Sequence, residues 1–194
     1  MTKVIGITGS IGSGKSTVSR HLTNMGYYVI DCDKISHSVL RDNAKAKEEI
    51  TNEFGTDIID QDGYISRKKL GSIIFKDKDK RIKLNGILHP KIKEEVKKEI
   101  KESNNQIVFL DCPLLFETDF VELCDYKVVV YVDMDSQIRR IMARDNITFP
   151  EALNKINAQM PLKEKVELAD YVIDNCHLEG DLDWQLTQLV KKIS

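Results

Sequence analysis

The residues with the clearest chemical potential form the run Gly9–Ser16 near the N-terminus. The run matches the phosphate-binding pattern G-x-x-x-x-G-K-[ST]. The apolar segment Val4–Ile7 precedes it and indicates a buried strand, and a helix that buries Val18, Leu22 and Met25 is expected to follow. Strand, glycine-rich loop and helix together predict a site for the phosphates of a nucleoside triphosphate; an ordinary glycine-rich turn would need all three to coincide by chance.

The chemistry of this loop depends on its backbone and on two side chains. Glycines let N–H groups turn inward to form an anion nest, and the helix N-terminus adds its partial positive charge. Lys15 is expected to reach the β- and γ-phosphates, and the Ser16 hydroxyl to ligate Mg²⁺. The expected nucleotide-binding residues here are Gly9, Ile11, Gly12, Ser13, Gly14, Lys15, Ser16 and Thr17.

Carboxylates end two further apolar segments. Tyr27–Ile30 is followed by Asp31 and Asp33, and Gln106–Asp111 ends in Asp111. Ligands of open α/β sheets bind beyond the carboxyl ends of the strands. We expect Asp33 to act as base or orienter for an attacking hydroxyl. The alternatives are a pair of solvated turn aspartates, or Asp33 as the N-cap of a helix starting near Lys34. Asp111 has the position of a Walker B carboxylate, which assists Mg²⁺ directly or through water.

Two arginines four residues apart follow the apolar segment Tyr126–Val132. Arg140 and Arg144 share one helix face and are candidates to neutralise charge on the transferred phosphoryl group. An ordinary surface helix is the alternative. The segment from Asn146 to Leu168 is expected to form a hinged helical lid.

The order of the segments predicts the fold. Five apolar strands alternate with helices, which is typical of a three-layer α/β/α P-loop NTPase fold with a five-stranded parallel sheet. We expect one kinase domain spanning 1–194. Its expected parts are a core of 1–33, 106–138 and 170–194, a helical, acceptor-binding insertion at 34–105, and a lid at about 139–169.

The insertion is too long and too charged to be a simple crossover. Within it, Leu88-His89-Pro90 is expected to break the helical pattern, with Pro90 opening a new helix. A lone histidine before a proline is usually structural, and a substrate role for His89 is the alternative.

Composition and charge argue against several classes of protein. The chain has 194 residues, with 29 Lys+Arg against 31 Asp+Glu and a net charge of -2, so no overall positive field favours nucleic acid. No segment approaches the ~20 apolar residues of a membrane span, and Val4–Ile7 runs directly into the loop without a secretory signal. The four cysteines lack metal or redox spacing. We therefore expect a reduced, cytoplasmic protein.

Three classes of phosphate-loop protein compete. A GTP-dependent switch would need an N-K-x-D signature, and none is present. A transporter or motor ATPase would bring a longer core, and nothing resembles L-S-G-G-Q. A small-molecule kinase needs a donor loop, an acceptor subdomain, a carboxylate beside the acceptor hydroxyl and a cationic lid. The chain offers a candidate for each of these parts.

The chain closely resembles dephospho-CoA kinases over almost its whole length. The P-loop alone indicates only an NTPase, whereas the P-L-L-F-E and A-D-x-V-I-D-N segments are far more specific. Two departures are Ser10, where the family usually has glycine, and Arg139-Arg140-Ile141, where R-L is more usual. The matching segments are Ile5–Thr17, Asp31–Asp33, Leu88–Pro90, Asp111–Glu117, Gln137 with Arg140 and Arg144, Gln159–Pro161 with Lys165, and Ala169–Asn175.

The resemblance implies transfer of the ATP γ-phosphate to the ribose 3′-hydroxyl of dephospho-CoA, with Mg²⁺, in a monomer or weak homo-oligomer. It implies Lys15, Asp33 and Arg140 as catalytic residues, and Ser16 and Asp111 as metal ligands. It adds Arg140, Arg144 and Asn175 to the nucleotide site. The acceptor residues that it implies are Asp33, His89, Asp111, Leu114, Leu115 and Phe116, although an apolar cluster like the last three is more often core.

Overall fold

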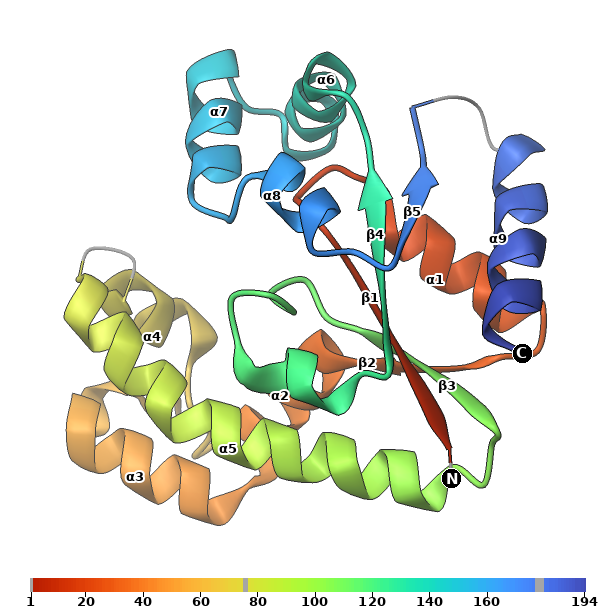
Figure 1. The fold of residues 1–194 in the computed structure, drawn as a ribbon. Helices are drawn as coiled ribbons and strands as arrows, with labels where there is room; N and C mark the ends of the chain where they lie inside the picture. The colour runs from red at the N-terminus through yellow and green to blue at the C-terminus, as the bar shows by residue number, and fades with distance from the viewer. Residues whose placement is uncertain (1, 75–76, 177–179) are drawn as a thin grey trace. The chain divides into compact units, whose positions relative to one another are not determined.

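The fold is built on a five-stranded parallel sheet, seen in a computed structural model that describes residues 2–74, 77–176 and 180–194 (Figure 1). The strand order is β2-β3-β1-β4-β5, with β3 inserted between the first two strands of the chain. In register, Ile7 of β1 lies between Asp111 of β3 and Val128 of β4. The predicted sheet is therefore confirmed. The strands are β1 (Lys3–Gly9), β2 (Tyr28–Asp31), β3 (Ile107–Asp111), β4 (Tyr126–Tyr131) and β5 (Tyr171–Asp174).

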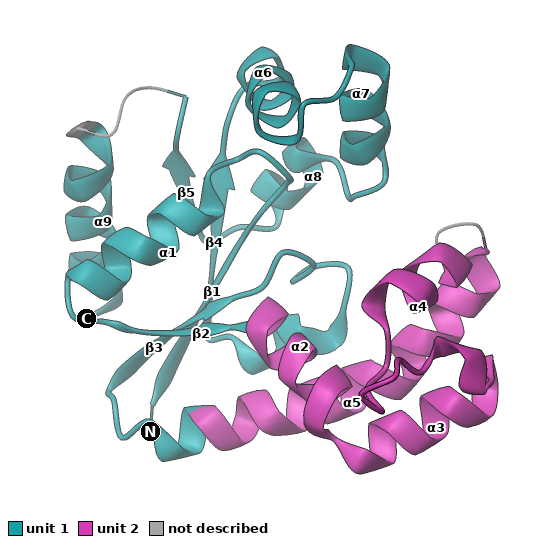
Figure 2. Ribbon diagram, turned by 180° about the vertical axis from the view of Figure 1, so that it is seen from behind, with its two compact units in different colours: residues 1–31, 100–194 teal, residues 32–99 magenta. Residues whose placement is uncertain are grey.

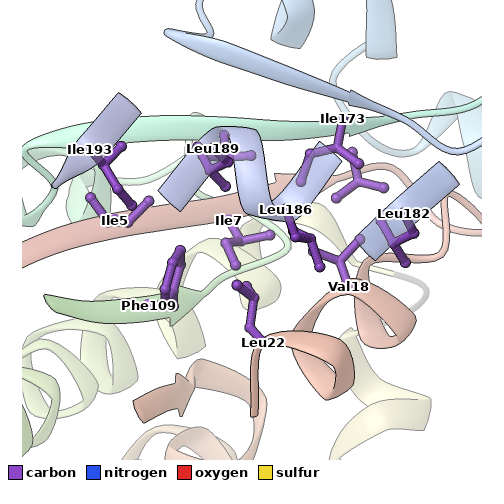
Figure 3. Close-up of a cluster of buried hydrophobic side chains, with 12 residues drawn as sticks. Ile5, Ile7, Val18, Leu22, Phe109, Ile173, Leu182, Leu186, Leu189 and Ile193 are labelled. Carbon is purple, nitrogen blue, oxygen red and sulfur yellow. The ribbon is translucent and has the colours of Figure 1, made fainter. Parts of the chain in front are cut away.

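One face of the sheet packs against α1 (Lys15–Asn24) and α9 (Gly180–Ile193). Alternate residues of β1, Ile5 and Ile7, point into this core, because side chains alternate between the two faces of a strand. Val18 and Leu22 of α1 meet them there, together with the leucine stripe of α9 (Figure 3). This apolar layer fixes the direction in which α1 leaves the glycine-rich loop.

The other face is packed closely around Gly6. A Cβ at Gly6 would lie 2.7 Å from both Leu115 Cδ2 and Cys124 Sγ, so no larger residue fits without a shift. The helix α8 (Leu162–Glu167) packs beside β4, and η2 (Asp119–Leu123) packs beside β1. Helical layers thus cover both faces of the sheet.

The chain divides into two compact units, residues 1–31 with 100–194 and residues 32–99 (Figure 2). The second unit is helical. It contains α2 (Cys32–Asp42), α3 (Ala44–Phe54), η1 (Thr56–Ile58), α4 (Arg67–Ile74) and most of α5 (Lys78–Glu102).

The expected helix break at Pro90 is wrong. Pro90 lies inside α5, which runs without interruption from Lys78 to Glu102. Proline removes one backbone donor from a helix. Here the buried stripe Leu84, Leu88, Ile92 and Val96 continues at four-residue spacing across the proline, so packing along one face outweighs that local cost.

Three helices gather at the end of the sheet where β1 leads into α1 (Figure 1). They are α6 (Met134–Asp145), α7 (Phe149–Asn157) and α8. Asp133 caps α6 by accepting from the Ser136 N–H at 2.8 Å, and Thr148 with Glu151 forms a capping box for α7. In the described part of the chain, no helix is long and apolar enough to cross a membrane.

One detail of the expected α1 face is also wrong. Met25 is the C-cap of α1 and is 40% exposed, whereas Val18 and Leu22 are fully buried. The helix ends at Asn24 and the chain turns at Gly26, which has φ +90°, so Met25 lies past the last turn that packs on the sheet.

Candidate active site

The glycine-rich loop joins β1 to α1 in the conformation that an anion nest requires. Gly12 and Gly14 have φ of +79° and +88°, and α1 begins at Lys15 immediately after Gly14. Among the described non-glycine residues, positive φ occurs at Asn104 and Asn146, so Ser10 has a backbone conformation open to any residue. The departure from glycine at this position therefore leaves the loop intact.

Neighbouring elements approach both of these glycines closely. A Cβ at Gly12 would lie 2.8 Å from Ile141 Cγ1 of α6, and a Cβ at Gly14 would lie 2.1 Å from Asn175 Nδ2. Asn175 Nδ2 donates to the Ser13 carbonyl at 2.7 Å. The loop is thus held between α6 and the residue that follows β5, and Asn175 lies at the predicted nucleotide site.

Lys15 and Asp111 form an ion pair inside the first unit. Lys15 Nζ bonds Asp111 Oδ1, and the Ser19 hydroxyl donates to Asp111 Oδ2 at 2.5 Å. Asp111 is 6% exposed, so its charge is both paired and hydrogen-bonded, as a buried carboxylate requires. The predicted loop lysine and Walker B carboxylate therefore lie together. Sequence reasoning missed Ser19, although it lies four residues after Lys15 on the same helix face.

Asp31 lies beside Asp111 in the sheet. The two residues are partners in the parallel pairing of β2 with β3, where both strands end. Asp33, two residues further on, belongs to the second unit and lies in the first turn of α2, which begins at Cys32. The alternative that Asp33 is the N-cap of a helix starting near Lys34 is therefore wrong.

The three arginines of α6 have different partners. Arg140 Nη2 donates to the Asn175 carbonyl at 2.8 Å, next to Gly14. Arg139 instead donates to Ser136 Oγ at 3.0 Å. Arg144 donates to the carboxylate of Asp145 and has a side chain that is 59% exposed. Arg140 is therefore the arginine of this helix that lies at the phosphate loop.

The loop after β3 is anchored by a buried lysine. Lys165 of α8 is fully buried; its Nζ donates to the Pro113 carbonyl at 2.9 Å and pairs with Glu117 Oε1 at 2.9 Å. Thr8 Oγ1 donates to the same carbonyl at 3.0 Å. Glu117 also accepts from the Met160 N–H at 3.2 Å. Residues 113–117 are thus tied to both β1 and α8.

The three apolar residues of this loop are not equivalent. Leu115 is fully buried against Gly6, whereas Leu114 is 39% exposed and Phe116 is partly exposed. Leu115 therefore belongs to the core, which is the alternative expected for this apolar cluster, and a role for it in acceptor binding stays a prediction. Leu114 and Phe116 keep accessible surface.

The remaining predicted acceptor residue, His89, lies in the second unit. It occupies α5, between the buried Leu88 and the exposed Pro90, and is itself partly exposed. Asp33 and His89 thus belong to the helical unit, while the phosphate loop and Asp111 belong to the first.

The oxygen ligands at the loop fit Mg²⁺. The Ser16 hydroxyl and the Asp111 carboxylate are hard oxygen donors from adjoining segments. The described residues contain no cluster of three or more His, Cys, Asp or Glu side chains placed to hold a metal. Mg²⁺ usually takes one or two protein oxygens and completes its shell with phosphates and water. The donor set therefore suits a metal that arrives with a nucleotide.

Comparisons with known proteins match nearly the whole chain to one family. A family model described as Dephospho-CoA kinase matches residues 3–179. A protein of that name from Carboxydothermus hydrogenoformans is 47% identical over 192 residues, covering 97% of this chain and 93% of that protein. The one from Oceanobacillus iheyensis is 47% identical over 195 residues, covering 99% and 98%.

Solved structures similar to this chain include a member of the same family. A dephospho-CoA kinase from Campylobacter jejuni has a TM-score of 0.75 at 30% identity, covering 100% of this chain and 98% of that one. A Thermus thermophilus protein has a TM-score of 0.86 at 32% identity, with the same coverage. Shikimate kinase from Acinetobacter baumannii, with a TM-score of 0.56 at 17% identity and coverage of 100% and 93%, shares the fold. The chain belongs to the dephospho-CoA kinase family.

Proposed function

We propose that this protein transfers the γ-phosphate of ATP to the ribose 3′-hydroxyl of dephospho-CoA, producing coenzyme A and ADP. The observation that carries the donor half is the meeting of Lys15, Asp111 and Arg140 around one phosphate loop at one end of the sheet. The acceptor half follows from membership of the family. The reaction is the last step of coenzyme A biosynthesis.

The phosphate loop holds the triphosphate. Backbone N–H groups of the loop and the start of α1 bind the phosphates, with Gly9, Ile11, Gly12, Ser13, Gly14 and Thr17 shaping the nest. Lys15 exchanges its bond to Asp111 for the β- and γ-phosphate oxygens. Ser16 and Asp111 hold Mg²⁺, which when bound neutralises charge on the phosphates.

Arg140 stabilises charge that develops on the transferred group. Its guanidinium reaches the Asn175 carbonyl beside Gly14, so a small movement brings it to the phosphates. Arg144 binds the nucleotide at the edge of the site, with Asp145 as its alternative partner. Asn175 maintains the loop through the Ser13 carbonyl.

The acceptor residues proposed here are those that the family resemblance implies. Asp33 accepts or orients the proton of the 3′-hydroxyl, the hydroxyl oxygen attacks the γ-phosphorus, and ADP leaves. His89, Leu114 and Phe116 hold dephospho-CoA, and residues 32–99 form the acceptor subdomain within a single kinase domain. Hydrogen exchange tests this assignment: dephospho-CoA should protect amides of residues 32–99, and protection confined to 100–194 would contradict it.

Helices α6–α8 act as a lid. Closure of these helices over the triphosphate excludes water and suppresses wasteful ATP hydrolysis. We place the reaction in the cytoplasm, in a monomer or weak homo-oligomer.

An acceptor panel tests the proposed function. ADP release from Mg²⁺-ATP is measured with dephospho-CoA, with nucleoside monophosphates and without acceptor. The proposal predicts release that depends on dephospho-CoA. Equal release with a nucleoside monophosphate, or without any acceptor, would contradict the acceptor assignment and leave the donor site standing.

A further inference from the structure

The peptide backbone of Ile11, at the tip of the phosphate loop, is held on both sides by glutamine side chains. Gln159 Oε1 accepts from the Ile11 N–H at 2.8 Å, and Gln137 Nε2 donates to the Ile11 carbonyl at 2.6 Å. Because the partners are a backbone donor and a backbone acceptor, they fix the orientation of each amide. We call this arrangement the Ile11 bracket.

The bracket comes from the helices beyond β4. Gln137 lies on α6 and is 2% exposed, and Gln159 lies between α7 and α8. The side chain of Ile11 packs against the apolar cluster of α6 and α7, which includes Ile141 and Ile156. Two hydrogen bonds and an apolar anchor therefore join the loop to these helices.

We infer that Gln137 and Gln159 are positioning residues that fix the phosphate loop in its binding conformation. Their role is to hold the loop and not to contact the reacting atoms. A loop already held in the bound shape loses less entropy when it binds phosphates, so affinity depends on what holds it. Gly12 adds to this role, since its lack of a Cβ lets α6 approach to within van der Waals contact.

The bracket also links the loop to the proposed lid. Helix α6 and the α7–α8 connection hold the two peptide groups on either side of the Ile11 Cα, so a movement of one against the other must break a bond to Ile11 or carry the loop along. The inference rests on the proposed function only in that a nucleotide occupies this loop.

Nucleotide affinity without acceptor tests the inference. Mg²⁺-ADP is titrated calorimetrically into wild-type protein and into Gln137→Met and Gln159→Met, which keep side-chain length and lose the bonds. We expect the Kd to rise about tenfold in each variant, the effect of one hydrogen bond of typical strength. Because dephospho-CoA is absent, a failure of the acceptor assignment would not affect this result.

The chain provides a matched control in Gln185 of α9. Its side chain holds the backbone of Asp174 in the same manner, with Oε1 accepting from the Asp174 N–H and Nε2 donating to the Asp174 carbonyl, both at 2.8 Å. Gln185→Met should lower the thermal midpoint by an amount similar to the bracket variants while changing the ADP Kd less than twofold. Bracket variants that bind ADP like wild type would overturn the inference and make the glutamines merely structural.

A conservative variant separates positioning from folding. Gln159→Glu keeps an oxygen that can accept from the Ile11 N–H, whereas Gln159→Met does not. In nucleotide-free protein, we expect the Ile11 amide to exchange with solvent about tenfold faster in Gln159→Met and at the wild-type rate in Gln159→Glu. Equal rates in all three proteins would overturn the bracket as the device that holds the loop.

Discussion

Residues that look alike in sequence have different surroundings in this structure, and the arginines of α6 show it most clearly. Arg140 reaches a carbonyl at the phosphate loop, whereas Arg139 bonds Ser136 and Arg144 bonds Asp145. Helical spacing places Arg140 and Arg144 on one face but cannot tell which of them lies at the phosphate loop. That difference depends on the partner of each side chain, which the spacing does not reveal.

Arg140→Ala should therefore lower kcat about 100-fold or more, since it removes the cation that we propose stabilises charge on the transferred phosphoryl group. Arg139→Ala is the control and should stay within a few fold of wild type. Steady-state kinetics with saturating ATP and dephospho-CoA measures both. A larger loss in Arg139→Ala would reassign the phosphate-contacting residue.

A second prediction at this scale concerns Gly14. Gly14→Ala combines a positive φ of +88° with a Cβ placed 2.1 Å from Asn175 Nδ2, so both the strain and the clash act on the phosphate loop. We expect a loss of about 1–3 kcal/mol in unfolding free energy together with weak nucleotide binding.

Gly26→Ala is the matched control for Gly14→Ala. Gly26 has a φ of +90° and no atom within 4 Å of its would-be Cβ, so it should lose about 1 kcal/mol and bind ADP normally. Denaturant unfolding and ADP titration compare the two variants. Similar ADP affinities would show that Asn175 does not need the space at Gly14.

At the scale of elements, the buried Lys165 attaches α8 to the loop at 113–117. Lys165→Met would remove the partner of Glu117, whose side chain is only 21% exposed, and one donor to Pro113. We expect a loss of about 1–3 kcal/mol in unfolding free energy, because the fully buried side chain would lose its hydrogen bonds to Glu117 and to the Pro113 carbonyl. Denaturant unfolding measures it, and Glu117→Gln added to Lys165→Met should recover part of the loss.

Lys163→Met is the control for this prediction. Lys163 lies on the same helix and is exposed, so its replacement should change stability by less than about 0.5 kcal/mol. Equal effects of the two lysine variants would mean that the Lys165 pair does not hold α8 to the loop at 113–117.

The start of α6 should respond to pH. Asp133 accepts from the Ser136 N–H, and this bond to the charged form holds the pKa of the Asp133 carboxyl below its usual range. Its stabilisation is therefore complete above the ordinary carboxyl pKa of about 4 and is lost as pH falls through the lower folded-state pKa.

Thermal unfolding of Asp133→Ala against wild type tests this sign. The difference in melting temperature should be constant from pH 7 to pH 5 and should shrink below about pH 4. Asp135→Ala, in the same helical turn but with an exposed side chain, is the control. A difference that stays constant to pH 3 would contradict the role of the charged cap.

The same elements show what the sequence could predict. The strands, the phosphate loop and the class of fold depend on local patterns, and the structure confirms them. Two other features join residues far apart in sequence and therefore could not be predicted from local patterns. They are the position of β3 between β1 and β2 and the hydrogen bond from Gln137 to Ile11. Pro90 shows the converse, since packing along α5 overrides a strong local signal.

At the scale of the whole molecule, the chain consists of two compact units. The first contains the phosphate loop with Lys15, Asp111 and Arg140, and residues 32–99 contain Asp33 and His89. We propose that the first unit binds the phosphoryl donor and that residues 32–99 bind the acceptor, because phosphoryl transfer depends mostly on positioning and charge neutralisation. The reaction proposed for this chain is transfer of the ATP γ-phosphate to dephospho-CoA.

Transfer of label from γ-³²P-ATP tests this reaction directly. The protein is mixed with Mg²⁺, labelled ATP and dephospho-CoA, and the products are separated and analysed by mass spectrometry. We predict label in coenzyme A, as one added phosphate on the ribose 3′-oxygen, with little inorganic phosphate. Label recovered as inorganic phosphate, or on another acceptor while dephospho-CoA stays unmodified, would contradict it.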